Sequence, residues 1–315
     1  MLQWAILKMR VAVIGRTEIL YETIKLFVEN GYEIPIVITS KEAPEYRRSA
    51  KDFENLANAV GAKYLYTSKL DECKAEIAEA SCDIAVSLNY SSVISQEVID
   101  LFPFSVLNAH GGDLPRYRGN ACQAWAILNG ESRIGLCIHS MIGGEIDSGD
   151  IIGRDYLDID INTKVTRCWE WMGERIPLMF LDAVQKLQDN PSYKIEVQSK
   201  KPEDALRCYP RNPEDGKIDW QRSNVEILRL INASNKPYSG AYCFFENEKI
   251  VIWDAEIFED DEVYLAECGQ IAKVEIDGSI VVITGKGKIK IKEIECSAFL
   301  GKPGKKINSI RKRFK

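Results

Sequence analysis

Short apolar runs alternate with segments of helical periodicity along the first third of the chain. Each run has the character of a strand buried on both faces, and each intervening segment repeats its apolar residues three and four positions apart. Strands are predicted at 10–15, 34–39, 64–66, 83–88 and 105–108, and helices at 18–29, 50–60, 71–80 and 95–101. This alternation predicts an α/β fold with a doubly wound, mainly parallel, Rossmann-like sheet.

The pattern changes beyond residue 190, where several prolines crowd into a short stretch that is typical of an interdomain linker. One helix follows, and the remaining sequence is rich in short strands at regular spacing, which indicates a small barrel or sandwich. The helix is predicted at 224–232 and the strands at 241–245, 250–253, 267–276, 279–284 and 288–294. We therefore predict two domains, a larger one at 9–200 and a smaller, β-rich one at 201–315.

The composition agrees with a globular protein of two domains. The chain has 315 residues, of which 45% are hydrophobic, and no uncharged apolar run reaches the roughly 18 residues of a membrane helix. Residues 1–8 are too short for a secretory signal, and Met9 directly precedes the first strand, so we expect Met9 to be the natural start. Nine cysteines without a CxxC pair indicate a reducing, cytoplasmic setting.

Positive charge is concentrated at the C-terminal end of an otherwise acidic chain. The net charge is −6, yet residues 286–315 contain eleven Lys or Arg and two Glu. Lys288, Lys290 and Lys292 alternate with isoleucines, so they share one face of a strand. This basic segment is compatible with RNA, anionic lipid or a phosphorylated ligand, and equally with a solvated surface.

Two enzyme classes are excluded by missing motifs. The turn after the first strand, Gly15–Leu20, has one glycine where a dinucleotide-binding fold has three, which excludes an NAD-dependent oxidoreductase. A serine hydrolase of the nucleophile-elbow type is excluded as well, because the chain has no GxSxG sequence. Zinc is disfavoured because the candidate region offers no second good histidine or cysteine ligand.

The candidate chemistry starts from the only two histidines, His110 and His139. His110 ends a predicted strand and precedes a glycine-rich loop, the place where open α/β sheets bind ligands. Asn108 lies two positions earlier and projects from the same face of the strand, so the amide and the imidazole can converge on one reacting atom. A polar cluster at 142–152 supplies carboxylates that can orient His110. The residues alone leave catalytic and purely structural roles for His110 open.

Three sequence elements in order resemble the 10-formyltetrahydrofolate-dependent formyltransferases. They are Asn108-Ala-His110, Leu114-Pro-Arg-Tyr-Arg-Gly119 and Asp147-Ser-Gly-Asp-Ile151. Segments 211–220 and 237–241 are similar to the linker and the start of the second domain in the methionyl-tRNA branch of that family. The resemblance implies an N-formyltransferase whose second domain is an OB-like barrel.

The family resemblance implies a role for each matched residue. Asn108 would hold the formyl oxygen, His110 would take a proton from the attacking amine or assist that step, and Asp147 would position His110. His139 is interpreted as a structural residue outside this set. The cosubstrate 10-formyltetrahydrofolate, with no metal, is expected to contact Leu88, Asn89, Tyr90, Ser91, Val93, Arg118, Met141, Ile142, Gly143 and Gly144.

The branch of the family decides which amine is formylated. The tRNA enzyme carries a basic, glycine-rich insertion where this chain has the mixed-charge segment 40–49, and its usual Ser-Leu after the histidine is Gly112-Asp113 here. Because a carboxylate repels phosphates, both differences favour a nucleotide-linked amino sugar, a small-molecule partner, over tRNA. The basic C-terminal segment favours tRNA. A methionyl-tRNA formyltransferase, a folate- or RNA-binding protein without activity, and a homodimer stay open, while no membrane partner is expected.

Overall fold

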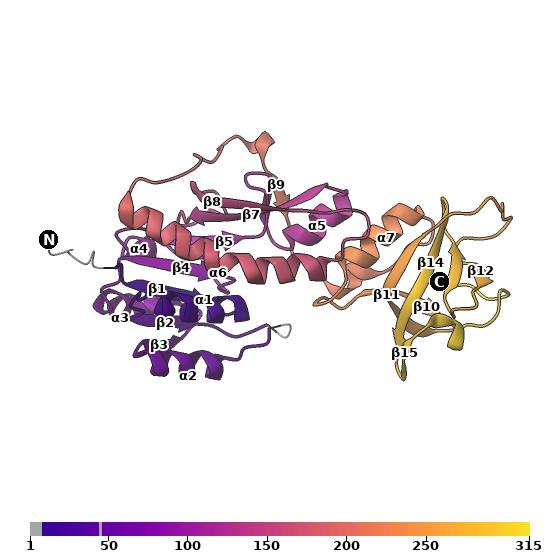
Figure 1. Ribbon diagram of the computed structural model, residues 1–315, viewed down its shortest axis with the longest axis horizontal. Coiled ribbons are helices and arrows are strands. Elements are labelled where there is room, and N and C mark those ends of the chain that lie inside the picture. Colours follow the sequence, from indigo (N-terminus) through magenta and orange to yellow (C-terminus); the bar gives the residue numbers. More distant parts are fainter. Residues whose placement is uncertain (1–7, 44–45) are drawn as a thin grey trace. The chain divides into compact units, whose positions relative to one another are not determined.

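The computed structural model describes residues 8–43 and 46–315, which form two compact units (Figure 1). Residues 1–7, and residues 44 and 45 of the segment 40–49 interpreted above, lie outside the described residues. The first unit comprises the residues up to 119 together with 135–156 and 170–207; the second comprises 120–134, 157–169 and 208–315. The units thus interleave along the chain, and the boundary at 200/201 stays a prediction.

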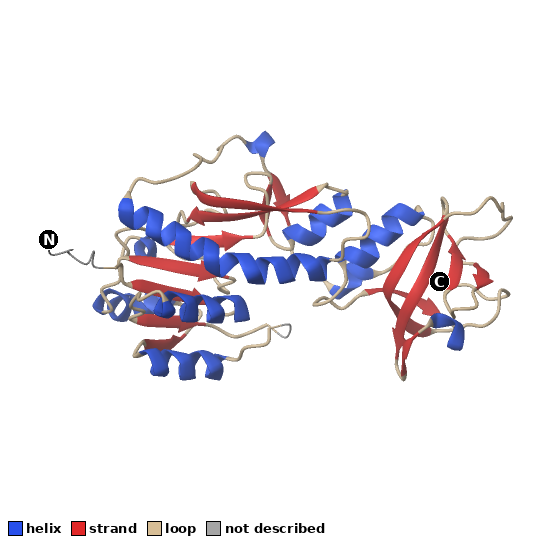
Figure 2. Ribbon diagram, viewed as in Figure 1, coloured by secondary structure: helices blue, strands red, loops and turns tan. Residues whose placement is uncertain are grey.

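The first unit is built on a seven-stranded sheet in the order β3-β2-β1-β4-β5-β7-β8 (Figure 2). The first five strands in sequence pair in parallel, while β7 runs antiparallel to β5. This order and the parallel pairing confirm the predicted doubly wound α/β class. The strands are β1 (Val11–Gly15), β2 (Ile36–Thr39), β3 (Lys63–Tyr66), β4 (Ile84–Leu88), β5 (Val106–His110), β7 (Arg133–Ser140) and β8 (Ile151–Asp158).

The helices begin where the sequence offers caps. Thr17 caps α1 by accepting from the Leu20 backbone N–H, and Ser49 and Asp52 form a capping box on α2, which Gly61 ends in the left-handed conformation. The predicted helix at 71–80 divides into a 3₁₀ turn and a short α-helix. The elements are α1 (Glu18–Glu29), α2 (Ala50–Val60), η1 (Leu70–Cys73), α3 (Lys74–Glu79), α4 (Gln96–Ile99), α5 (Cys122–Asn129) and α6 (Val165–Asp189).

The second unit holds an antiparallel sheet in the order β10-β11-β14-β13-β12, with β15 paired to β14. It encloses one core, to which α7 contributes Ile227 and Ile231. The predicted strand at 267–276 shortens to β12, and the β-rich character of this part is confirmed. The elements are α7 (Asn224–Ala233), β10 (Ala241–Phe245), β11 (Glu248–Phe258), β12 (Ile271–Val274), β13 (Ile280–Ile283), β14 (Lys288–Cys296), β15 (Phe299–Gly301) and η4 (Pro303–Lys305).

A small ladder joins β6 (Tyr117–Gly119) to β9 (Leu206–Cys208), and two 3₁₀ turns, η2 (Pro202–Asp204) and η3 (Pro213–Gly216), flank β9 in the sequence. Backbone bonds at one end of this ladder run from Leu206 N–H to the Arg116 carbonyl. Among the described helices, none has both the length and the apolar character that a membrane crossing requires.

Candidate active site

Strand β5 delivers Asn108 and His110 to one end of the sheet, and β7 places His139 beside them. In the β5–β7 ladder Asn108 lies directly opposite His139, and the amide Nδ2 of Asn108 is 3.2 Å from the His139 Nε2. His139 was interpreted as lying outside the catalytic set. The antiparallel register instead makes it an immediate neighbour of Asn108.

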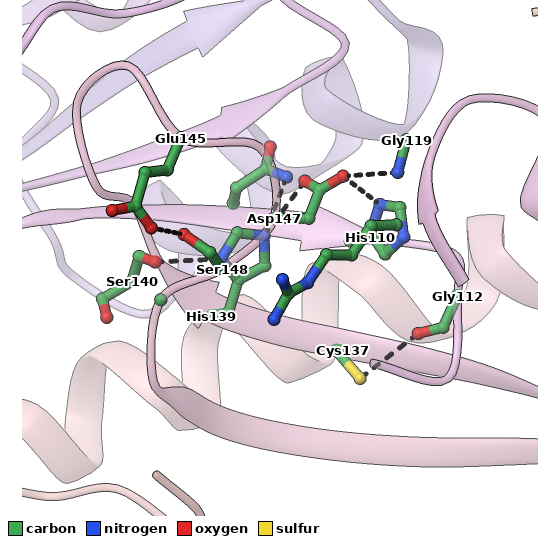
Figure 3. A network of polar contacts seen from close by, with 12 residues as sticks. His110, Gly112, Gly119, Cys137, His139, Ser140, Glu145, Asp147 and Ser148 are labelled. Carbon is green, nitrogen blue, oxygen red and sulfur yellow. Dashed lines mark hydrogen bonds and ion pairs between the residues drawn. The ribbon is translucent and has the colours of Figure 1, made fainter. Parts of the chain in front are cut away.

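Asp147 connects the two histidines. One carboxylate oxygen lies 3.4 Å from His110 Nδ1 and the other lies 3.4 Å from His139 Nε2. The first oxygen also accepts a hydrogen bond of 2.9 Å from the Gly119 backbone N–H. Figure 3 shows this carboxylate pointing between the two imidazole rings. The structure therefore brings Asn108, His110 and Asp147 together, with His139 as the link between the amide and the carboxylate.

The electrostatics of the cluster keep Asp147 ionised. Burial by itself would raise the pKa of its carboxyl, because only 13% of the side chain is exposed. The charge of His110, the hydrogen bond and charge of His139 and the Gly119 N–H outweigh burial and hold the pKa well below its usual range. The backbone of Asp147 has φ +49°, a left-handed conformation that residues other than glycine seldom adopt. The carboxylate is thus held in place by its partners against a backbone cost.

Both ring nitrogens of His110 face oxygen acceptors. Its Nε2 is 2.5 Å from the Tyr117 carbonyl on β6, while Nδ1 faces Asp147. Carbonyl oxygens accept only, so a hydrogen bond to the Tyr117 carbonyl requires a proton on Nε2, and that proton has to be absent when Nε2 accepts one from a substrate amine. To act on a substrate, Nε2 has to exchange the Tyr117 carbonyl for a substrate group while Nδ1 remains on Asp147.

The loops predicted to bind the cosubstrate flank one core cluster of the first unit. Tyr90 and Met141 both pack against that cluster, and the Gly143 N–H donates to the Gln96 side chain at 2.9 Å, which ties the 141–144 loop to the start of α4. Asn89 has φ +51° and Val93 is exposed. The contacts of Leu88, Asn89, Tyr90, Ser91, Val93, Met141, Ile142, Gly143 and Gly144 with a cosubstrate stay a prediction.

Two charged residues of the motif region have protein partners. Arg118, predicted to bind the cosubstrate, donates to the side chain of Gln198 at 2.9 Å and to the Ser199 carbonyl at 3.0 Å. Asp113 accepts from Arg154 at 2.7 Å and from the Tyr156 hydroxyl at 3.2 Å. Arg154 thus offsets the charge of Asp113, and the expectation that this carboxylate repels phosphates stays a prediction.

Sequence reasoning missed three contributors to the site: His139, the Tyr117 carbonyl and the Gly119 N–H. His139 is visible as one of only two histidines, but its place beside Asn108 follows from a strand register that periodicity does not show. The other two are backbone groups, which leave no trace in residue identity.

An amide donor next to a carboxylate-bound histidine, at the end of a parallel strand, is suited to group transfer. The amide can stabilise a developing oxyanion and the histidine can accept a proton. Among the described residues, no group of three or more His, Cys, Asp or Glu side chains could hold a metal ion. The fold is that of a doubly wound α/β protein, and the cluster contains the side chains that general acid–base catalysis uses.

Comparison with known proteins gives the family. Residues 9–174 match the formyl transferase family and residues 211–310 match the formyl transferase C-terminal domain. The chain therefore belongs to the formyl transferase family, and the protein is an N-formyltransferase. A methionyl-tRNA formyltransferase from Acetivibrio thermocellus is 27% identical over 293 residues, which cover 91% of this chain and 92% of that relative.

Solved structures with the same fold are more distant in sequence. WlaRD, a sugar 3N-formyl transferase solved with dTDP and 5-N-formyl-THF, has a TM-score of 0.68 and 19% identity, covering 93% of this chain and 100% of its own. An N-formyltransferase from Helicobacter canadensis, in complex with folinic acid and dTDP-3-aminofucose, has a TM-score of 0.68 and 19% identity, covering 90% and 98%. HypX from Aquifex aeolicus with tetrahydrofolic acid has a TM-score of 0.63 and 17% identity, covering 95% of this chain and 47% of HypX.

Proposed function

We propose that the protein transfers the formyl group of 10-formyltetrahydrofolate to the primary amine of a nucleotide-linked amino sugar. The observation that carries this proposal is the joined set of Asn108, His110 and Asp147 at the carboxyl end of β5. Two structural neighbours were solved with a formyl-folate compound together with dTDP or a dTDP-linked amino sugar. Both observations support the donor and the class of acceptor.

The proposed reaction assigns one task to each side chain. The amine nitrogen of the acceptor attacks the formyl carbon, the bond from that carbon to N10 of the folate breaks, and tetrahydrofolate leaves with a proton in its place. Asn108 donates to the formyl oxygen as negative charge develops there. His110 accepts the amine proton through Nε2, and Asp147 stabilises the charge that His110 then carries.

The charge pattern of the second unit supports a small acceptor. The lysines of β14 face carboxylates of β11 and the loop after it: Lys292 pairs with Asp254 and Glu256 at 3.2 Å each, and Lys288 pairs with Asp260. Beyond β14, Lys306 pairs with Glu248 at 2.6 Å. These partners offset the charges of the β14 lysines and of Lys306, so β14 does not offer a continuous row of unpaired cations to a phosphate backbone.

Methionyl-tRNA is the second candidate acceptor. The relative that is 27% identical across 91% of this chain is a methionyl-tRNA formyltransferase. Lys302, Lys305 and Arg311 are exposed near the C-terminus and are the residues a tRNA backbone would contact. A formyl transfer to tRNA would use the same three site residues.

A competition assay separates the two acceptors. Purified protein and 10-formyltetrahydrofolate are offered a panel of amino-sugar nucleotides together with charged initiator tRNA, and mass spectrometry identifies which acceptor gains a formyl group. Formylation of a sugar nucleotide supports the proposal, and formylation of Met-tRNA replaces it with the second candidate. Parallel assays of His110→Ala and Asn108→Ala test the site: near-normal rates in both folded variants would contradict the assignment.

A further inference from the structure

Residues 195–204, which we call the return segment, contact the loop that carries Asp147. At one end, the Ile195 N–H donates to the Ile151 carbonyl at 2.9 Å. Further along, Lys200 lies 3.4 Å from Glu145. The return segment therefore contacts the rest of the first unit both at the start of β8 and within the loop before β8.

Gln198 is the most buried side chain of this segment, with 1% exposure. Both ends of its amide are used. The Oε1 accepts from Arg118 Nε at 2.9 Å, and the Nε2 donates to the Gly149 carbonyl at 2.7 Å. A buried amide satisfied at both ends fixes the distance between its two partners, because losing either bond leaves a polar atom unpaired in the interior.

Those two partners belong to the two pieces of backbone that hold the candidate site. Arg118 lies between Tyr117, whose carbonyl contacts His110, and Gly119, whose N–H contacts Asp147. Gly149 lies two residues after Asp147. A Cβ atom at position 149 would lie 1.8 Å from the Ser140 carbonyl oxygen, so the backbone of the loop packs directly against Ser140 at this point.

We propose that Gln198 is a positioning residue: its side-chain amide clamps the Asp147 loop to strand β6 and so sets the contact between Asp147 and His110. Asp147 needs such a clamp because its left-handed backbone conformation is unfavourable, and the surrounding contacts have to offset that cost. The kinetic part of the following test rests on the proposed function, whereas its spectroscopic part does not.

The sharpest variant is Gln198→Glu. It keeps the size of the side chain and the contact with Arg118, but it replaces the donor to the Gly149 carbonyl with an oxygen that repels it. We expect kcat for formyl transfer to fall by about 10- to 100-fold, the range for partners that orient a site from behind. KM for both substrates should stay within about threefold, since the Gln198 side chain is buried and both ends of its amide are bonded to protein groups. Glu203→Gln, an exposed change in the same segment, is the matched control and should leave kcat unchanged.

A second variant keeps the test decisive if Gln198→Glu does not fold. Arg118→Met removes the other end of the clamp and leaves the bond to Gly149 intact. Gln198→Met and Arg118→Met each break the same linkage. The double variant should therefore lose no more kcat than the more damaging of the two single variants. Additive losses would overturn the clamp.

The direct readout is the contact between His110 Nδ1 and the Asp147 carboxylate, 3.4 Å apart in the structure. With only two histidines in the chain, ¹⁵N-histidine NMR resolves the ring nitrogens of each. We expect the ring-nitrogen shifts of His110 to change in Gln198→Glu and to stay at their wild-type positions in Glu203→Gln. An unchanged signal in folded Gln198→Glu overturns the proposal. If the wild type formylates no tested acceptor, the proposed function fails, but this signal still decides the role of Gln198.

Discussion

Asp147 is a nearly buried carboxylate that faces two imidazole rings and one backbone N–H. In the proposed reaction its charge stabilises the imidazolium that forms when His110 accepts a proton, and a neutral side chain in its place would leave that imidazolium without a counter-charge.

Replacing Asp147 with asparagine should therefore lower kcat by about 10²- to 10⁴-fold, the usual share of general acid–base catalysis. The change keeps the shape of the side chain and removes its charge. Asp150→Asn is the matched control, since Asp150 lies three residues away and pairs with Lys194 at 2.6 Å. Steady-state kinetics of the two variants decide the point, and equal rates would contradict the role of Asp147.

The pKa of Asp147 also predicts how stability depends on pH. Its native pKa lies below the unfolded-state value of about 4, so the ionised carboxylate stabilises the native state above that pH. This contribution is lost as the pH falls below about 4. In urea unfolding, wild type should be more stable than Asp147→Asn at pH 7 and pH 5, with a gap that narrows at more acidic pH. A gap independent of pH would show that the charge of Asp147 plays no part.

At the scale of elements, the turn between β5 and β6 brings the backbone against the His110 ring. A Cβ at Gly112 would lie 2.2 Å from the Tyr117 carbonyl and 2.5 Å from His110 Nε2. The buried Cys137 thiol donates to the Gly112 carbonyl at 3.4 Å and holds the turn from the β7 side. Glycine at this position is therefore required by close approach, not by a special φ.

Gly112→Ala and Gly173→Ala make the same chemical change with opposite expected results. At Gly112 the added methyl displaces His110 or β6, so we expect about 1–3 kcal/mol of destabilisation and at least a tenfold loss of kcat. Gly173 lies in α6 with open space around its Cβ position, so alanine there should stabilise the fold by about 0.5–1 kcal/mol. Thermal unfolding and steady-state rates of both variants check the pair.

Helices and strands with strong periodicity were predictable because each segment carries its own hydrophobic pattern. Strands β1, β4 and β5 and helices α1 and α2 lie within a residue or two of the predicted ranges. The predicted helix at 95–101 shortens to α4, and no bounds were predicted for α5, β8 and α6. In α5 and at the start of β8, motif residues and buried apolar residues mix, so the periodicity is weak. Helix α6 is amphipathic but contains Pro177, which sequence rules place at helix ends.

At the scale of the whole molecule, several lysines of the basic segment 286–315 pair with carboxylates of the second unit. Asp254 shows how: burial alone would raise its pKa, but Lys164 and Lys292 outweigh burial and hold the pKa below its usual range. The strip of lysines on β14 is thus part of an ion-pair network across the β11–β14 ladder.

The combined change Lys290→Gln and Lys292→Gln should then destabilise the second unit by about 1 kcal/mol and leave the choice of acceptor unchanged. Differential scanning calorimetry measures the first effect and the competition assay the second. Lys305→Gln with Arg311→Gln is the contrasting pair, because both side chains are exposed. If tRNA is the acceptor, this second pair of changes should weaken tRNA binding. It should also reduce the slope of the logarithm of the binding constant against the logarithm of salt concentration by about 0.7–0.9 for each lost phosphate contact.

The sequence by itself determined the doubly wound sheet, the β-rich second part and the family signature of Asn108, His110 and Asp147. Hydrophobic periodicity and spacing along one strand are local properties, so they can be read without the fold. Only the tertiary structure placed His139 beside Asn108, paired Asp113 with Arg154 and joined Arg118 to Gln198, contacts that span 31, 41 and 80 residues. Such pairs depend on antiparallel register and on a returning segment, which no local pattern encodes.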